Sequence, residues 1–343
     1  MDSFFVIIVI FYFLFIIYAA NQVMIRAWHQ RYLNLMLYNL LGLVLLLGLF
    51  VLQIVLMPAD SSLPTTMQID QTSGLLAFVL TLVGVGLGLG VLASPKVRQI
   101  ISRIVGAAGS YEPDSAIHTT AVILCIALVV ATLTDYALAG GQSGLAENIE
   151  SRGVSTSEQF FQGVIFIAAA FLGIGFAIRR AGSASLERLG LRLPTRDDRR
   201  SGIYAGLVLF VISIVYAMLW EAISPQAFQE QTQAAEQLAR SIDTLPGIFA
   251  LTVSAAFSEE ILIRGALQPV FGIGLSSGFF VLLHTQYLGT PTMVWLFTVS
   301  VIFGLIRRRY STSAAIIAHL VYNAVPLILN YLLVLTSSPS GGA

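Results

Sequence analysis

The sequence is dominated by about ten runs of roughly 20 apolar residues, the length that a helix needs to cross a bilayer at about 1.5 Å rise per residue. Of 343 residues, 57% are apolar and only 10% are Asp, Glu, Lys or Arg, against about 25% charged residues in a soluble domain. This pattern predicts an all-α polytopic membrane protein with about ten transmembrane helices. The runs lie near residues 4–24, 35–57, 74–94, 116–138, 160–178, 202–222, 247–269, 273–288, 291–306 and 313–335.

Three of these runs have features of their own. The runs at 273–288 and 291–306 are short and are separated by Gly-Thr, which predicts a tight helical hairpin or a helix that stops inside the membrane. The run at 74–94 carries glycines with small-residue spacing, which is typical of closely packed membrane helices rather than of a phosphate-binding loop. These glycines are Gly84, Gly86, Gly88 and Gly90.

Basic residues are distributed unevenly among the loops. Fifteen of the 18 fall in alternate loops, whereas the opposite loops hold only Arg152 and Arg240, and Arg264 lies within an apolar run. Because positive charge is enriched on the cytoplasmic side, this distribution predicts that both termini lie outside. We take the plasma membrane as the default location. The 18 acidic residues bring the net charge to zero, so the composition does not indicate a nucleic-acid partner.

The longest polar stretch on the predicted inner side divides the chain. Residues 182–201 are interpreted as a basic cytoplasmic linker, between an amino-terminal five-helix membrane region at 1–181 and a carboxy-terminal bundle at 202–343. No role can be assigned to the amino-terminal region. Residues 224–246 are rich in Gln and Ala, which predicts a solvated connector or a short helix on the outer surface.

Ionisable side chains are costly inside a bilayer, so those that occur there usually line a cavity, pair with each other or act chemically. Counting about 1.5 Å per residue from the inner helix ends predicts that these groups lie at a similar depth, roughly 9–15 Å from the inner face. Three separate helices would then contribute to one shared site. The polar groups in these runs are Glu259, Glu260, Arg264, His284, His319 and Asn323.

Spacing within each run predicts which side chains share a helix face. Glu260 and Arg264 are four residues apart, which favours an ion pair along the helix, whereas Glu259 points about 100° away and lacks that partner. His319 shares a face with Asn323, as Phe280 does with His284. A carboxylate without a local counter-charge, near two histidines, is typical of a general base or a metal ligand.

Three motifs in this region resemble those of the CPBP family of intramembrane proteases, which includes the type II CAAX prenyl endopeptidases and bacteriocin-processing and immunity proteins. The family patterns EExxxR, FxxxH and HxxxN begin here at Glu259, Phe280 and His319. The resemblance implies that Glu259 and His284 activate a water for attack on a peptide carbonyl. It also implies that His319 and Asn323 stabilise the oxyanion, while Glu260, Arg264 and Phe280 support the site.

The resemblance leaves the cofactor open between none and zinc. Glu259, His284 and His319 are the ligand types that Zn²⁺ binds with one open position for water. However, the sequence lacks HExxH, in which one helix supplies two ligands and the base. A ligating Glu259 would leave Glu260 as the only nearby base, and that residue is assigned to Arg264. We therefore favour the metal-free mechanism.

The sequence thus predicts an intramembrane endopeptidase that opens toward the cytoplasm and acts on a membrane-associated or lipid-modified peptide or protein. Its other expected partner is membrane lipid, and nothing in the sequence indicates an oligomeric state. The alternative is a non-catalytic scaffold or bacteriocin-immunity protein of the same fold, in which the polar cluster only fixes helix packing. A transporter is disfavoured because no inverted repeat is visible.

Overall fold

The computed structural model describes residues 3–57, 69–142, 144, 147, 156–229, 231–232 and 244–337. In this part of the chain the named elements are all helices, and they form eight helical stretches that are long and apolar enough to cross a membrane, one of which, Leu245–Leu282, comprises three of these elements. The prediction of an all-α polytopic membrane protein is therefore confirmed. The number of ten spans and the outside position of the termini stay predictions. Arg152, Arg240 and most of the connector at 224–246 lie outside the described residues.

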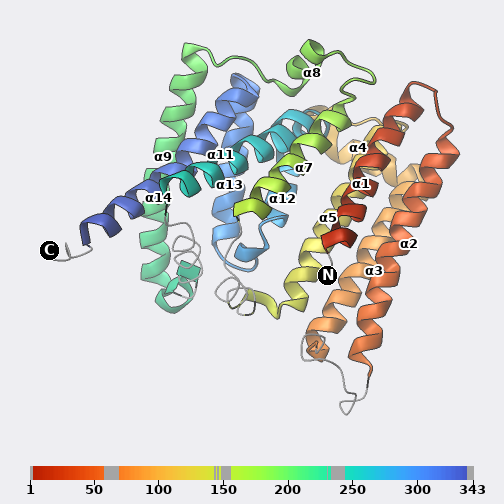
Figure 1. Cartoon of the computed structure of the whole chain (residues 1–343), viewed down its shortest axis with the longest axis horizontal. Helices are drawn as coiled ribbons and strands as arrows, with labels where there is room; N and C mark the ends of the chain where they lie inside the picture. The colour runs from red at the N-terminus through yellow and green to blue at the C-terminus, as the bar shows by residue number, and fades with distance from the viewer. Residues whose placement is uncertain are drawn as a thin grey trace. The chain divides into compact units, whose positions relative to one another are not determined.

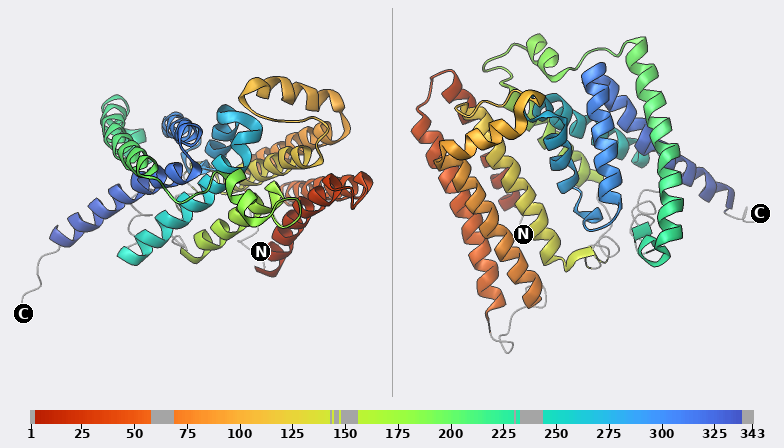
Figure 2. Two further views of the ribbon diagram at one scale, coloured as in Figure 1. Left: turned by 90° about the horizontal axis from the view of Figure 1, so that it is seen from above. Right: turned by 180° about the vertical axis from the view of Figure 1, so that it is seen from behind.

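The chain forms two compact units, and the first comprises Met1–Leu145, Phe171–Ser185 and Leu267–Met293. Both Figure 1 and Figure 2 show its helices α2, α3 and α5 side by side. Each of these helices is almost entirely apolar, as expected where lipid surrounds the bundle. The helices of this unit are α1 (Ser3–Met24), α2 (Gln30–Val55), α3 (Gln71–Ala93), α4 (Pro95–Val105), α5 (Ala116–Leu138) and α12 (Gln268–Leu282).

The glycines of α3 allow the close helix packing that their spacing predicts. A Cβ atom added at Gly84 would collide with Val130 of α5, and one added at Gly88 would lie 2.6 Å from a methyl carbon of Leu41 in α2. At Gly86, between them, a Cβ would meet nothing within 4 Å. Two glycines four residues apart therefore bring α3 close to two different neighbours.

The second unit comprises Ala146–Ala170, Leu186–Ala266 and Val294–Ala343. Its backbones approach closely where α9 crosses α14, because a Cβ at Gly206 would lie 2.7 Å from the carbonyl oxygen of Ala318. A buried apolar core that includes Leu209, Phe303 and Ala318 joins α9, α13 and α14. The main helices of this unit are α9 (Arg196–Ile223), α11 (Leu245–Glu260), most of α13 (Thr292–Arg309) and α14 (Thr312–Ser337); α7 (Thr156–Ile174) and α8 (Gly182–Leu189) each contribute residues to both units.

Two helix boundaries differ from the prediction. The chain continues from α11 through a π-helical segment, Ile261–Leu267, directly into α12, and its break is a kink at Gly272, where φ is +77°. Glycine tolerates this positive φ at little steric cost. The helix α12 then ends at Leu282 rather than near residue 288, so His284 lies beyond the helix end and not on its face. The predicted division at residues 182–201 stays a prediction.

Candidate active site

The carboxylate of Glu260 is completely buried and is held by two partners in the second unit. Arg264 donates from Nε to one carboxylate oxygen at 3.0 Å, so the ion pair predicted from their spacing is present. Arg264 also donates from a terminal nitrogen to the hydroxyl of Ser300 on α13 at 2.8 Å. Both members of the pair have 0% exposed side chains, and a buried charge pair requires such additional hydrogen bonds to offset its desolvation.

The second partner of Glu260 is His319 on α14. Its Nδ1 lies 3.1 Å from the other oxygen of Glu260, and its Nε2 lies 3.9 Å from a carboxylate oxygen of Glu259. The ring stacks on Phe303, with 5.1 Å between centroids and 25° between planes. An ionised carboxylate only accepts hydrogen bonds, so the contact with Glu260 places a proton on Nδ1 of His319.

The two adjacent glutamates therefore have different surroundings. Glu260 uses both oxygens for Arg264 and His319 and is inaccessible, whereas the side chain of Glu259 is 21% exposed and faces Nε2 of His319. A carboxylate that acts as a general base must reach its water. Of the two, Glu259 has the accessibility for that role, and Glu260 has the geometry of a group that orients a histidine.

The segment from Arg188 to Thr195, which joins the end of α8 to the start of α9, contacts both the π-helix and the start of α14. Arg188 donates to the carbonyl oxygen of Gly265 at 3.0 Å. Thr312, the first residue of α14, donates from its hydroxyl to the carbonyl of Leu189 at 2.6 Å and from its backbone to that of Gly190 at 3.0 Å. This segment thus connects the helix that carries Glu260 and Arg264 to the helix that carries His319.

The same segment is fixed to α9 by a buried aspartate. Asp198 accepts hydrogen bonds from the backbone and hydroxyl of Thr195, which completes a capping box at the start of α9. Its other oxygen accepts from Arg192 at 3.0 Å and from Ser311 at 2.9 Å. A carboxylate with four donors can be buried without leaving its charge unpaired. The polar stretch predicted as a linker is therefore well anchored at this point.

His284 belongs to the first unit, together with Phe280. Its Nδ1 lies 2.8 Å from the carbonyl oxygen of Phe280, and the two rings are 4.5 Å apart at their centroids. The ring of Tyr287 lies nearly parallel to the imidazole of His284, with 6.5 Å between the ring centroids. A carbonyl oxygen only accepts, so Nδ1 carries a proton and the neutral ring has its lone pair on Nε2.

The structure brings Glu259, Glu260, Arg264 and His319 together within one unit. Asn323 follows one turn after His319 on α14 and is half-buried. The meeting of His284 with this group stays a prediction, because His284 belongs to the other unit. Sequence reasoning missed Ser300, Phe303, Arg188 and the contact between Glu260 and His319. A lone serine in the apolar run of α13 was the one signal for Ser300.

The metal-binding alternative can be tested against the donors present. Glu259 and Nε2 of His319 are donor types that Zn²⁺ accepts, and a carboxylate on Nδ1 is the usual outer partner of a ligating histidine. In the described part of the second unit, no three His, Cys, Asp or Glu side chains are arranged to hold a metal ion. This unit therefore supplies two candidate ligands, and a third from His284 stays a prediction.

A comparison with known families agrees with the motifs. Residues 241–325 match the family model described as type II CAAX prenyl endopeptidase Rce1-like, and this region contains all three motifs. The predicted family resemblance is therefore confirmed over these residues, and the match supports a domain of a membrane endopeptidase type within an integral membrane protein. No curated protein and no solved structure matches the chain.

Proposed function

We propose that this protein is an intramembrane endopeptidase that hydrolyses a peptide bond in a membrane-associated or lipid-modified peptide or protein. The observation that supports this most strongly is the unequal use of the two adjacent glutamates. Glu260 is fully engaged by Arg264 and His319, while Glu259 stays partly accessible beside Nε2 of His319. The Rce1-like match over residues 241–325 supports the same class of reaction.

In the proposed mechanism, Glu259 and His284 remove a proton from a water as its oxygen attacks the peptide carbonyl carbon. The carbonyl π electrons move to oxygen and form a tetrahedral oxyanion. Hydrogen bonds to that oxygen from His319 and Asn323 stabilise it more than they stabilise the uncharged carbonyl. The intermediate then collapses, the C–N bond breaks, and the proton taken from water passes to the leaving amine.

The contact with Glu260 sets a condition on His319 in this mechanism. Because Nδ1 already holds a proton that points at Glu260, only Nε2 can face the oxyanion. To donate from Nε2, the ring must carry both protons during the reaction. If the enzyme instead binds Zn²⁺, Nε2 must be unprotonated, and the ion would supply a Lewis acid for the carbonyl oxygen.

The competing proposal is a scaffold or immunity protein in which the cluster only fixes helix packing. The buried Glu260–Arg264 pair fits a packing role. A packing role, however, gives no reason for Glu259, a second and accessible glutamate at the same place. We further propose that the site opens toward the cytoplasm from the plasma membrane.

Cleavage by the purified protein in lipid nanodiscs tests the proposal. Quenched-fluorescent peptides that carry a lipid group or a hydrophobic anchor are compared between the native protein, Glu259→Gln, His284→Ala and the matched control Glu221→Gln. Glu221 lies exposed near the end of α9. We expect the native protein and the control to cleave, and the two site variants to lose at least about a hundredfold in rate.

Two results would count against this reasoning. Equal cleavage by Glu259→Gln and the native protein removes Glu259 from the mechanism. Absence of cleavage by a folded native protein, across broad pools of membrane-anchored peptides, favours the scaffold. A chelator arm, followed by addition of Zn²⁺, distinguishes the metal-dependent reaction from the metal-free one.

A further inference from the structure

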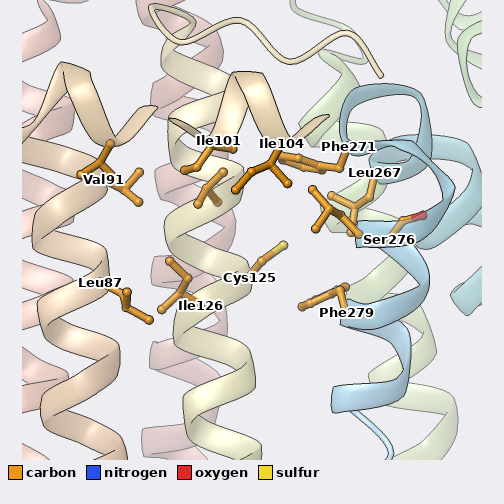
Figure 3. Close-up of a pocket in the computed structure, with 13 residues that line it drawn as sticks. Leu87, Val91, Ile101, Ile104, Cys125, Ile126, Leu267, Phe271, Ser276 and Phe279 are labelled. Carbon is orange, nitrogen blue, oxygen red and sulfur yellow. The ribbon is translucent and has the colours of Figure 1, made fainter. Parts of the chain in front are cut away.

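The first unit contains an apolar cavity of about 360 Å³, lined by α3, α4, α5 and the region around α12. Figure 3 shows side chains from these helices facing the same space. All lining side chains are hydrocarbon except Cys125 and Ser276, and the hydroxyl of Ser276 donates to the carbonyl of Gly272. The volume falls within the range of small-ligand sites, roughly 300–1,000 Å³, but the cavity offers a ligand almost nothing polar.

The helix α4 closes one side of this cavity and has the character of a helix that lies in a membrane interface. It starts directly after α3 at Pro95, with Ser94 as its cap. Arg98 then donates to the carbonyls of Val91 and Leu92 at the end of α3, at 3.0 and 3.1 Å. These bonds fold α4 back against α3, so the short helix lies at the end of a spanning segment.

The apolar side of α4 is only partly used inside the protein. Ile101 and Ile104 line the cavity, yet Ile104 is 65% exposed and its neighbour Ile100 is 52% exposed. Exposed isoleucines on an amphipathic helix are typical of contact with the acyl region just below the lipid headgroups. The cavity therefore meets the bilayer at the depth where acyl chains begin.

Two exposed cations border the same edge of α4. Lys96 and Arg103 are both exposed, and helical geometry places each within roughly 100° of Ile104 around the axis. Arg98, by contrast, is engaged by backbone carbonyls of α3 and of Pro113. The edge that leads to the cavity thus combines hydrocarbon with two positive charges at headgroup level, which is the pattern that attracts anionic lipids.

We propose that this cavity holds one acyl chain of an anionic phospholipid, whose phosphate is bound by Lys96 and Arg103. The apolar lining fits a saturated or unsaturated hydrocarbon chain, which brings no hydrogen-bonding group into the cavity. The cations favour a lipid with net negative charge over a zwitterionic one. This site lies wholly in the first unit and is independent of the proposed peptidase activity.

Native mass spectrometry of the full chain in detergent tests the proposal. Phosphatidylglycerol and phosphatidylcholine with identical acyl chains are added at matched concentrations, and bound lipid is counted. We expect the native protein to retain phosphatidylglycerol, and Lys96→Gln/Arg103→Gln to bind it about tenfold more weakly. The matched control Arg196→Gln/Arg200→Gln removes two exposed cations from the start of α9 and should bind like the native protein.

A second variant tests the cavity itself. Ile126→Phe adds bulk to the α5 side of the lining and should abolish retention of phosphatidylglycerol and its thermal stabilisation of the protein. If Ile126→Phe fails to fold, the charge variants alone decide. Equal retention of both lipids, equal loss in both charge variants, or undiminished retention of phosphatidylglycerol by a folded Ile126→Phe would each overturn the proposal.

Discussion

Replacement of Arg264 by Met should reveal how strongly the buried network depends on its cation. In the native protein the side chain of Glu260 is 0% exposed, and its carboxylate contacts Arg264 and His319. The substitution removes the first of these two contacts and leaves the second. Removing one member of a buried ion pair costs about 3–5 kcal/mol, because the other charge stays in a low-dielectric interior. The loss of the bond to Ser300 is part of that cost. We therefore expect the free energy of unfolding to fall by about 3–5 kcal/mol.

A double-mutant cycle separates this effect from lost packing. Glu260→Leu alone should also cost about 3–5 kcal/mol, since it leaves Arg264 charged and buried. The double variant removes both charges and takes these hydrogen bonds away from His319 and Ser300, at about 1–3 kcal/mol for each group. With every cost at the middle of its range, the coupling energy should be about 4 kcal/mol.

The assay is unfolding of the purified protein in mixed micelles by titration with sodium dodecyl sulfate, followed by circular dichroism. The native protein and the three variants are measured under one set of conditions. Additive costs in the double variant would show that Glu260 and Arg264 do not interact. If Arg264→Met lowers the free energy of unfolding by less than about 1 kcal/mol, the carboxylate of Glu260 is not buried away from water, and the reasoning is wrong.

Three further outcomes follow from the packing and can be measured by the same titration. Gly84→Ala should destabilise the protein by about 1–3 kcal/mol because the new methyl group collides with Val130, whereas Gly86→Ala should be neutral or stabilising by up to about 1 kcal/mol; equal effects would contradict the close approach. Arg188→Gln should cost about 1 kcal/mol by releasing the carbonyl of Gly265, and no change would contradict that contact. Thr312→Val keeps the shape of the side chain but loses its hydroxyl bond, so it should cost about 1–2 kcal/mol; a stability equal to that of the native protein would show that the bond contributes nothing.

The features that the sequence predicted well depend on local periodicity. Apolar runs predict helices because a single segment inside a bilayer can hydrogen-bond its backbone groups internally only as a helix. The Glu260–Arg264 pair follows from a spacing of four, and it forms even though Arg264 lies in a π-helix. The small-residue spacing of α3 likewise indicates close packing without knowledge of the neighbouring helices.

The features that the sequence did not predict depend on contacts between distant segments. Phe303 and Ser300 are ordinary residues of an apolar helix until α13 packs beside α14 and Arg264. The π-helix was not predicted because its seven residues are mostly apolar. A wider helical turn over so short a stretch leaves no periodic pattern in the sequence. The end of α12 was misplaced because residues 283–288 contain no glycine or proline to signal a helix end, yet the chain forms a turn at His284.

The two histidines of the proposed site share one local arrangement that bears on either mechanism. Each imidazole directs Nδ1 at an oxygen that can only accept, a carboxylate for His319 and a backbone carbonyl for His284. Each ring therefore offers Nε2 for chemistry, and its orientation is fixed before substrate arrives. The partners differ in charge, however, because Glu260 can balance an imidazolium and the carbonyl of Phe280 cannot. This difference supports His319 as the doubly protonated donor and His284 as the neutral base, which is the division of roles that water activation and oxyanion stabilisation require.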